Sequence, residues 1–135
     1  MSYATSAALQ AALYQVLAND AALAAEVGSA VYDALPPGTL PDLYVTLGPE
    51  TVRDRSDGSG AGALHRVTVS VVGTAAGFAS VKAAAGAVSD ALSGPPPALA
   101  RGRIVYLNFH KAKAARIDTG DLRRIDLTYD VRVED

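Results

Sequence analysis

The segment from Leu122 to Val133 constrains the fold of this 135-residue chain more than any other, because polar and apolar residues alternate strictly along most of it. Strict alternation is the period of a β-strand that buries one face and exposes the other. One face carries Ile125, Leu127, Tyr129, Val131 and Val133, and the other carries Arg124, Asp126, Thr128, Asp130 and Arg132. The second face, with both signs of charge, either faces water or fits a partner.

Three-and-four spacing of apolar residues predicts two amphipathic helices. The first can be capped by Thr5 or Ser6 and extends to about Ala18, and Asp20 can cap a short further piece that Gly28 stops. The second helix is predicted from residue 78 to residue 92.

The remaining regular segments read as strands. The segment from Arg103 to about Lys113 is apolar on both faces in its first half, which we therefore expect to be covered on both sides. Gly48-Pro49 marks a bulge within a strand, and Asp118 to Asp121 forms a turn. In chain order the predicted strands cover residues 31–34, 43–52, 63–72, 103–113 and 122–133.

The order of these elements predicts an α+β fold, with a mainly antiparallel sheet and two amphipathic helices packed on one face. The length fits one domain over residues 1–135. Between two of the strands, residues 53–62 are polar, rich in glycine and without periodicity, so we expect a long flexible connection that becomes ordered on a partner. Its charged residues join the polar face of the last strand as the expected protein interface: Arg53, Asp54, Arg55 and Asp57, with Arg124, Asp126, Asp130 and Arg132.

Residues that could perform chemistry are scarce. His65 and His110 lie on different predicted strands and form no metal-binding spacing, so we interpret both as polar strand positions and expect no metal. The Ser-Asp pairs at Ser56 and Ser89 have the character of turn and cap residues, and the glycine run at 58–62 lacks a P-loop ending. Three cations near Phe109, namely Lys111, Lys113 and Arg116, fit a solvated or interface strand end.

Composition excludes further classes of function. A net charge of -2 disfavours tight binding of duplex DNA, and the absence of cysteine excludes disulfides and thiolate metal sites. The start of the chain is unlike a signal peptide, and no stretch reaches transmembrane length, so we expect a soluble intracellular protein without a cofactor.

Turn and core residues near the beginning and at the end of the chain resemble those of a known protein family. The closing residues Arg116, Asp118, Thr119 and Gly120, with the strand up to Glu134, resemble the final hairpin of the tail-completion proteins of long-tailed phages, also called tail terminators or tail-to-head joining proteins. The chain departs from the family in its opening region, where the family often has proline directly before an aromatic residue. In this sequence Asp42 and Leu43 separate Pro41 from the aromatic Tyr44. The opening signature of that family is similar to Leu23, Val27, Gly28, Val31, Tyr32, Asp33, Pro36, Pro37, Leu40, Pro41, Tyr44, Leu47 and Gly48.

The resemblance implies a structural protein of a phage, a prophage or a gene transfer agent, and not an enzyme. Such proteins form a ring, typically of six copies, that caps the tail tube and joins it to the neck, with DNA passing through the central hole. The implied partners are further copies of the chain, the major tail tube protein and a neck, stopper or portal-side connector. Assembly would take place in the host cytoplasm. The alternative is a small α+β enzyme or ligand-binding domain with a pocket between sheet and helices.

Overall fold

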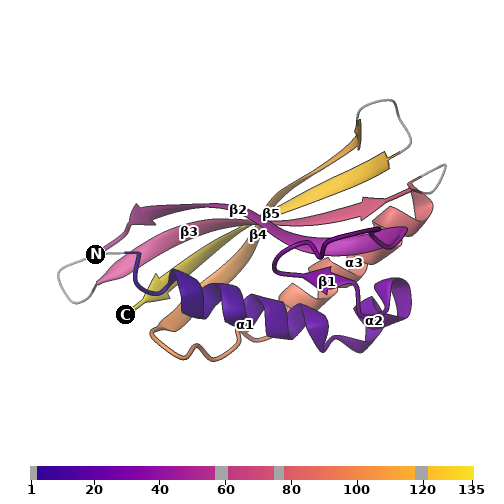
Figure 1. Ribbon diagram of the computed structural model, residues 1–135. Helices are drawn as coiled ribbons and strands as arrows, with labels where there is room; N and C mark the ends of the chain where they lie inside the picture. Colours follow the sequence, from indigo (N-terminus) through magenta and orange to yellow (C-terminus); the bar gives the residue numbers. More distant parts are fainter. Residues whose placement is uncertain (1–2, 57–60, 75–77, 118–121) are drawn as a thin grey trace.

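Three helices cover one face of a five-stranded sheet in the computed structural model, which describes residues 3–56, 61–74, 78–117 and 122–135 (Figure 1). The sheet has the order β1-β2-β3-β5-β4; β1 is parallel to β2, and every other pairing is antiparallel. The predicted α+β class is confirmed. The elements are α1 (Ser6–Ala18), α2 (Ala21–Val27), β1 (Val31–Tyr32), β2 (Leu43–Asp54), β3 (Gly62–Gly73), α3 (Ala79–Leu92), β4 (Arg103–Ile117) and β5 (Leu122–Glu134).

The helix ends follow the sequence signals in part. The carboxylate of Asp20 accepts a hydrogen bond from the backbone N–H of Leu23 at 2.9 Å, and Gly28 ends α2 with a positive φ of 63°. Thr5 stands at the cap position of α1, but its buried side chain makes no capping bond. The predicted side-chain cap of the first helix is therefore wrong, whereas that of α2 is confirmed.

The apolar face of β5 lies in the core, as its alternation predicted. Leu127 pairs with Val69 of β3, and both side chains are buried against the helix layer. Figure 1 shows β3 and β5 in the middle of the sheet, where strands lie on both sides of them. Burial of apolar side chains on one face of these two strands stabilises the sheet.

A bulge in β2 confirms the interpretation of Gly48-Pro49. The register of β2 against β3 shifts between Leu47 and Glu50. Because of this shift, Glu50 pairs with Val67, whose side chain is buried on the helix side of the sheet. The bulge thus brings an acidic side chain to the helix side, where the simple alternation of β2 would not place it.

The expectation that the first half of β4 is covered on both sides is wrong. Val105, Tyr106 and Phe109 are 39%, 37% and 55% exposed. The reason is the strand order: β4 is the edge strand, and the helices pack on β1, β2, β3 and β5. The strand also runs to Ile117, beyond the predicted end near Lys113.

The connection between β2 and β3 is shorter than predicted. Arg53 and Asp54 belong to β2, where they pair with Leu64 and Ala63, and β3 already begins at Gly62. Within the connection, the backbone N–H of Arg55 donates to the carbonyl oxygen of Gly62 at 2.8 Å. The expectation of a long flexible segment therefore fails at both of its ends. The predicted turn over residues 118–121 lies outside the described residues.

Candidate assembly surface

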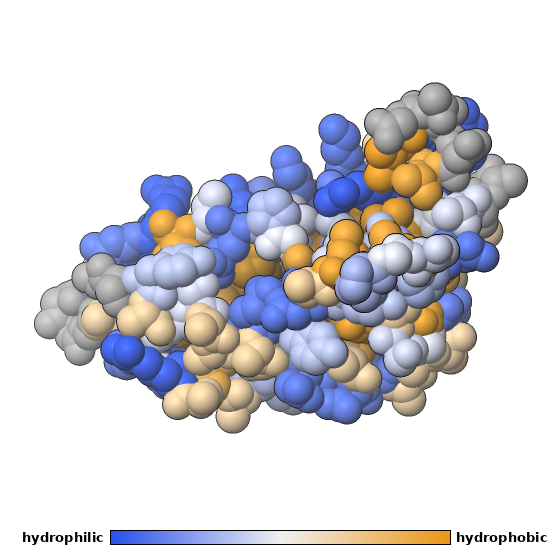
Figure 2. Space-filling view, viewed as in Figure 1, coloured by the Kyte–Doolittle hydropathy of each residue, from blue (hydrophilic) through white to orange (hydrophobic). Residues whose placement is uncertain are grey.

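The sheet face opposite the helices is called the open face here. The cross-strand register places polar side chains of β3, β5 and β4 side by side on it. Figure 2 shows hydrophilic side chains along the upper side of the sheet, away from the helices. The open face carries Arg66, Thr68 and Ser70 from β3, Arg124, Asp126, Thr128, Asp130 and Arg132 from β5, and Lys111 and Lys113 from β4.

Asp130 is held by a bidentate ion pair across two strands. Arg66 donates from Nε and Nη2 to the two carboxylate oxygens at 2.8 and 3.2 Å. The Nδ1 atom of His110 lies 3.6 Å from the same carboxylate. The hydrogen bond from Arg66 lowers the pKa of Asp130 below its usual value, so the carboxylate stays ionised at neutral pH. The pair is half exposed on the arginine side, which limits its contribution to stability.

Asp126 forms a second cluster on the open face. Ser70, which is fully buried, donates to Asp126 Oδ1 at 2.6 Å, and Arg124 Nε donates to the same oxygen at 2.8 Å. Arg124 Nη2 also donates to Ser70 Oγ at 3.1 Å. Burial raises the pKa of Asp126, but the hydrogen bonds from Ser70 and Arg124 outweigh this effect, and the net pKa is lowered.

A hollow of about 260 Å³ opens beside this cluster. Three cationic side chains and one carboxylate line it, so its local charge is positive. Thr128, which also lines the hollow, is only 9% exposed although it lies on the open face. The hollow is lined by Pro49, Thr68, Lys111, Lys113, Arg124, Asp126 and Thr128.

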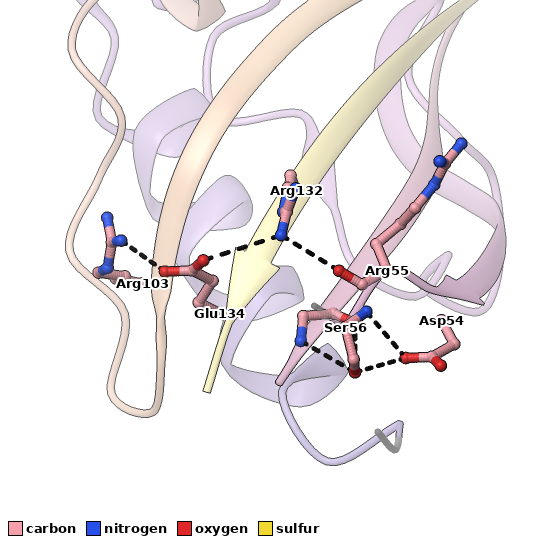
Figure 3. A network of polar contacts seen from close by, with 7 residues as sticks. Asp54, Arg55, Ser56, Arg103, Arg132 and Glu134 are labelled. Carbon is pink, nitrogen blue, oxygen red and sulfur yellow. Dashed lines mark hydrogen bonds and ion pairs between the residues drawn. The ribbon is translucent and has the colours of Figure 1, made fainter. Parts of the chain in front are cut away.

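A third polar network ties β4 and β5 to the end of β2 (Figure 3). Arg103 donates to Glu134 Oε1, and Arg132 lies 3.8 Å from the other oxygen of Glu134. Arg132 Nη2 also donates to the backbone carbonyl of Arg55 at 3.1 Å. The network holds Arg55, the residue directly after β2, against β5.

The eight predicted interface residues are brought together only in part. Arg124, Asp126, Asp130 and Arg132 share the open face. Arg53 pairs with Leu64, which in turn pairs with Arg132, so these three residues lie in one row across the strands. Asp54 instead accepts hydrogen bonds from Ser56, which lower its pKa, and Arg55 participates through its backbone. Asp57 lies outside the described residues.

Sequence reasoning missed the partners on the neighbouring strand. Arg66 and Ser70 hold Asp130 and Asp126, although they are 64 and 56 residues away along the chain. In the sequence, Arg66 and Ser70 alternate with valines at 67, 69 and 71, and this alternation places both residues on the polar face of β3. What could not be predicted is the antiparallel register that sets Arg66 opposite Asp130.

A partly buried polar cluster lies on the helix side, where Tyr3, Ser6 and Glu50 line part of a hollow of about 420 Å³. Glu50 Oε1 accepts hydrogen bonds from Tyr3 and Ser6, both at 2.7 Å, and Glu50 Oε2 lies 3.1 Å from Nδ1 of His65. His65 is fully buried on the core face, so its interpretation as an ordinary polar strand position is wrong. The hydroxyl of Ser6 bonds a carboxylate rather than an imidazole, which is not the arrangement of an activated nucleophile.

Metal-binding clusters and membrane-spanning helices are both absent from the described residues. Within them, no group of three or more His, Cys, Asp or Glu side chains could hold a metal ion. No helix in the same ranges is both long and apolar enough to cross a membrane.

Comparisons with known proteins connect this fold to a family. Residues 11–134 match the family described as tail completion protein gp17. A solved structure, the virion of a native gene transfer agent particle, contains a chain that is 60% identical, with a TM-score of 0.95. The alignment covers 99% of this chain and 100% of that chain. No curated protein matches this sequence.

Proposed function

This chain belongs to the tail completion protein gp17 family, and we propose that six copies of it form a ring that ends the tail tube and joins it to the head-neck complex. The chain is a structural protein of a tailed virion or gene transfer agent particle, and not an enzyme. The enzyme alternative is therefore abandoned. The observation that carries the proposal is full-length similarity, at 60% identity, to a chain of a gene transfer agent virion.

The open face is the proposed assembly surface. Its charged side chains are positioned before any partner arrives, because Asp126 and Asp130 are held by Ser70, Arg124 and Arg66. A surface with fixed side chains loses less conformational entropy on binding than a mobile one. Arg132, Arg53, Asp54 and Arg55 extend the proposed surface towards the β2–β3 connection. Asp57, which lies outside the described residues, belongs to the same proposed interface.

The proposed partners are further copies of the chain, the major tail tube protein and a neck, stopper or portal-side connector, all meeting in the host cytoplasm during assembly. DNA passes through the ring without tight binding. A conduit must not retain DNA, and each neutralised phosphate adds affinity that depends on salt. The net charge of -2 fits passage better than capture.

Deletion of the gene in a host that produces the particles tests this proposal. We expect tails of uncontrolled length, or tails that are not attached to filled heads, under the electron microscope. A plasmid copy of the wild-type gene should restore normal particles, and filled heads should form in both strains. Normal tails on filled heads in the deletion strain would refute tail completion.

A further inference from the structure

Charge is divided unevenly along this sequence. No lysine or arginine occurs before Arg53, so all 12 cationic side chains lie in the remainder of the chain. Five of the 14 acidic residues precede Arg53, and these are Asp20, Glu26, Asp33, Asp42 and Glu50. The part before Arg53 folds into α1, α2, β1 and nearly all of β2.

The fold converts this division into two edges of opposite charge. The strand order places β1 at one edge of the sheet and β4 at the other. Figure 1 shows α2 and β1 beside the start of β2. Glu26, Asp33 and Asp42 are exposed on or beside these elements, and we call them the acidic edge. Leu35, which closely follows Asp33, is 50% exposed and gives this edge an apolar side chain.

The other edge is basic. The β4 segment Arg103–Ile117 contains no acidic residue and is exposed along most of its length. Lys111 and Arg116 are exposed, and neither forms an ion pair within the described part of the chain. We call the cationic side chains of this strand the basic edge: Arg103, Lys111, Lys113 and Arg116.

Apolar surface accompanies the basic edge. Phe109 is 55% exposed and packs edge to face on the buried ring of Tyr129, with ring centroids 5.8 Å apart. A largely apolar hollow of about 310 Å³ lies between α3 and β4, where Phe109, Ala112 and Ala114 face Ala85 and Gly86. An exposed strand with an apolar hollow beside it is typical of a surface that is covered in an assembly.

We propose that copies of this chain associate head to tail, with the basic edge of one copy on the acidic edge of the next. This inference rests on the proposed ring and names its copy-to-copy contact. Pairing either edge with itself would bring like charges together, which opposes association. A contact between two different edges is heterologous, and heterologous contacts are those that close rings of more than two copies. The part of the open face on β3 and β5 is then left for the other proteins of the particle.

Charge reversal in a producing host that lacks the chromosomal gene tests the contact. Lys111→Glu with Arg116→Glu reverses the basic edge, and Glu26→Lys with Asp42→Lys reverses the acidic edge. We expect each double variant to lower the number of complete tailed particles at least tenfold. The quadruple variant restores opposite charges at every contact and should return the number to near the wild-type level. Asp90→Lys, on the exposed side of α3 and at neither edge, is the matched control and should have no effect.

Cross-linking in assembled particles provides a measurement that does not depend on reversed charges. The chain has no cysteine, so Asp42→Cys and Arg116→Cys give unique sites. A short bismaleimide should link the variant with both cysteines into a ladder beyond the dimer, and each single-cysteine variant should remain a monomer.

Three results would overturn the inference: normal particle numbers from both double variants, a quadruple variant as defective as the doubles, or dimers from Arg116→Cys alone. If tail completion itself is wrong, the gene deletion already gives normal particles. If only the edge contact is wrong, the deletion is defective and the edge variants are not.

Discussion

Exchanging the two members of the Arg66–Asp130 ion pair tests whether this part of the open face contacts a neighbouring protein or faces water. Reversing aspartates alone, for example with Asp126→Lys and Asp130→Lys, breaks hydrogen bonds within the subunit as well as any contact outside it. The exchange Arg66→Asp with Asp130→Arg keeps the ion pair and inverts only the charge pattern that a neighbour meets.

The structure sets the expected energies. The pair is bidentate, at 2.8 and 3.2 Å, but its side chains are 47% and 23% exposed. An exposed pair of this kind contributes about 0.2–1 kcal/mol, so Asp130→Ala should lower the free energy of unfolding by that amount. The exchange should recover most of it. At an interface, in contrast, each misplaced charge costs several kcal/mol, and about 1.4 kcal/mol already corresponds to a tenfold change in affinity.

Two measurements on the same variants decide the question. Urea unfolding of the purified subunits should give closely similar midpoints for wild type and the exchanged pair. Particle counts by electron microscopy should fall more than tenfold for the exchanged pair and little for Asp130→Ala. Wild-type stability together with wild-type particle numbers for the exchanged pair would show that this part of the open face is solvated.

Three further predictions concern stability. Leu127→Ala should lower the free energy of unfolding by about 2–5 kcal/mol, because the leucine is 4% exposed in the core; the neighbouring Thr128→Ala serves as its control on the open face and should cost less in the same urea titration. Gly102→Ala should cost about 2–4 kcal/mol, since φ is +76° and a Cβ would lie 2.6 Å from the carbonyl oxygen of Glu134; wild-type thermal stability would contradict this. The lowered pKa of Asp126 contributes stability that is present above its usual value of 3.8 and is lost as the pH falls further, so Asp126→Asn should lose less stability than wild type between pH 6 and pH 3.

Local patterns determined much of this fold because they depend on neighbours in the chain. The alternation of Leu127 and its neighbours determines which face of β5 is buried, whatever strand lies beside it. Asp20 caps α2 through a bond three residues away, and Gly48-Pro49 disrupts the ladder where it stands. The common face of Arg124, Asp126, Asp130 and Arg132 was predictable for the same reason, since the period of the strand alone places them together.

Only the tertiary structure decided what depends on strand order and register. The apolar first half of β4 suggested a covered strand, but β4 is an edge beyond the helix layer, and so Phe109 is exposed. Arg53 and Asp54 have the composition of a loop, yet pairing with β3 extends the ladder through them. The ion pair of Arg66 with Asp130 spans 64 residues. Such contacts are set by long-range pairing of strands, which no local period encodes, because the same alternation fits several neighbours and registers equally well.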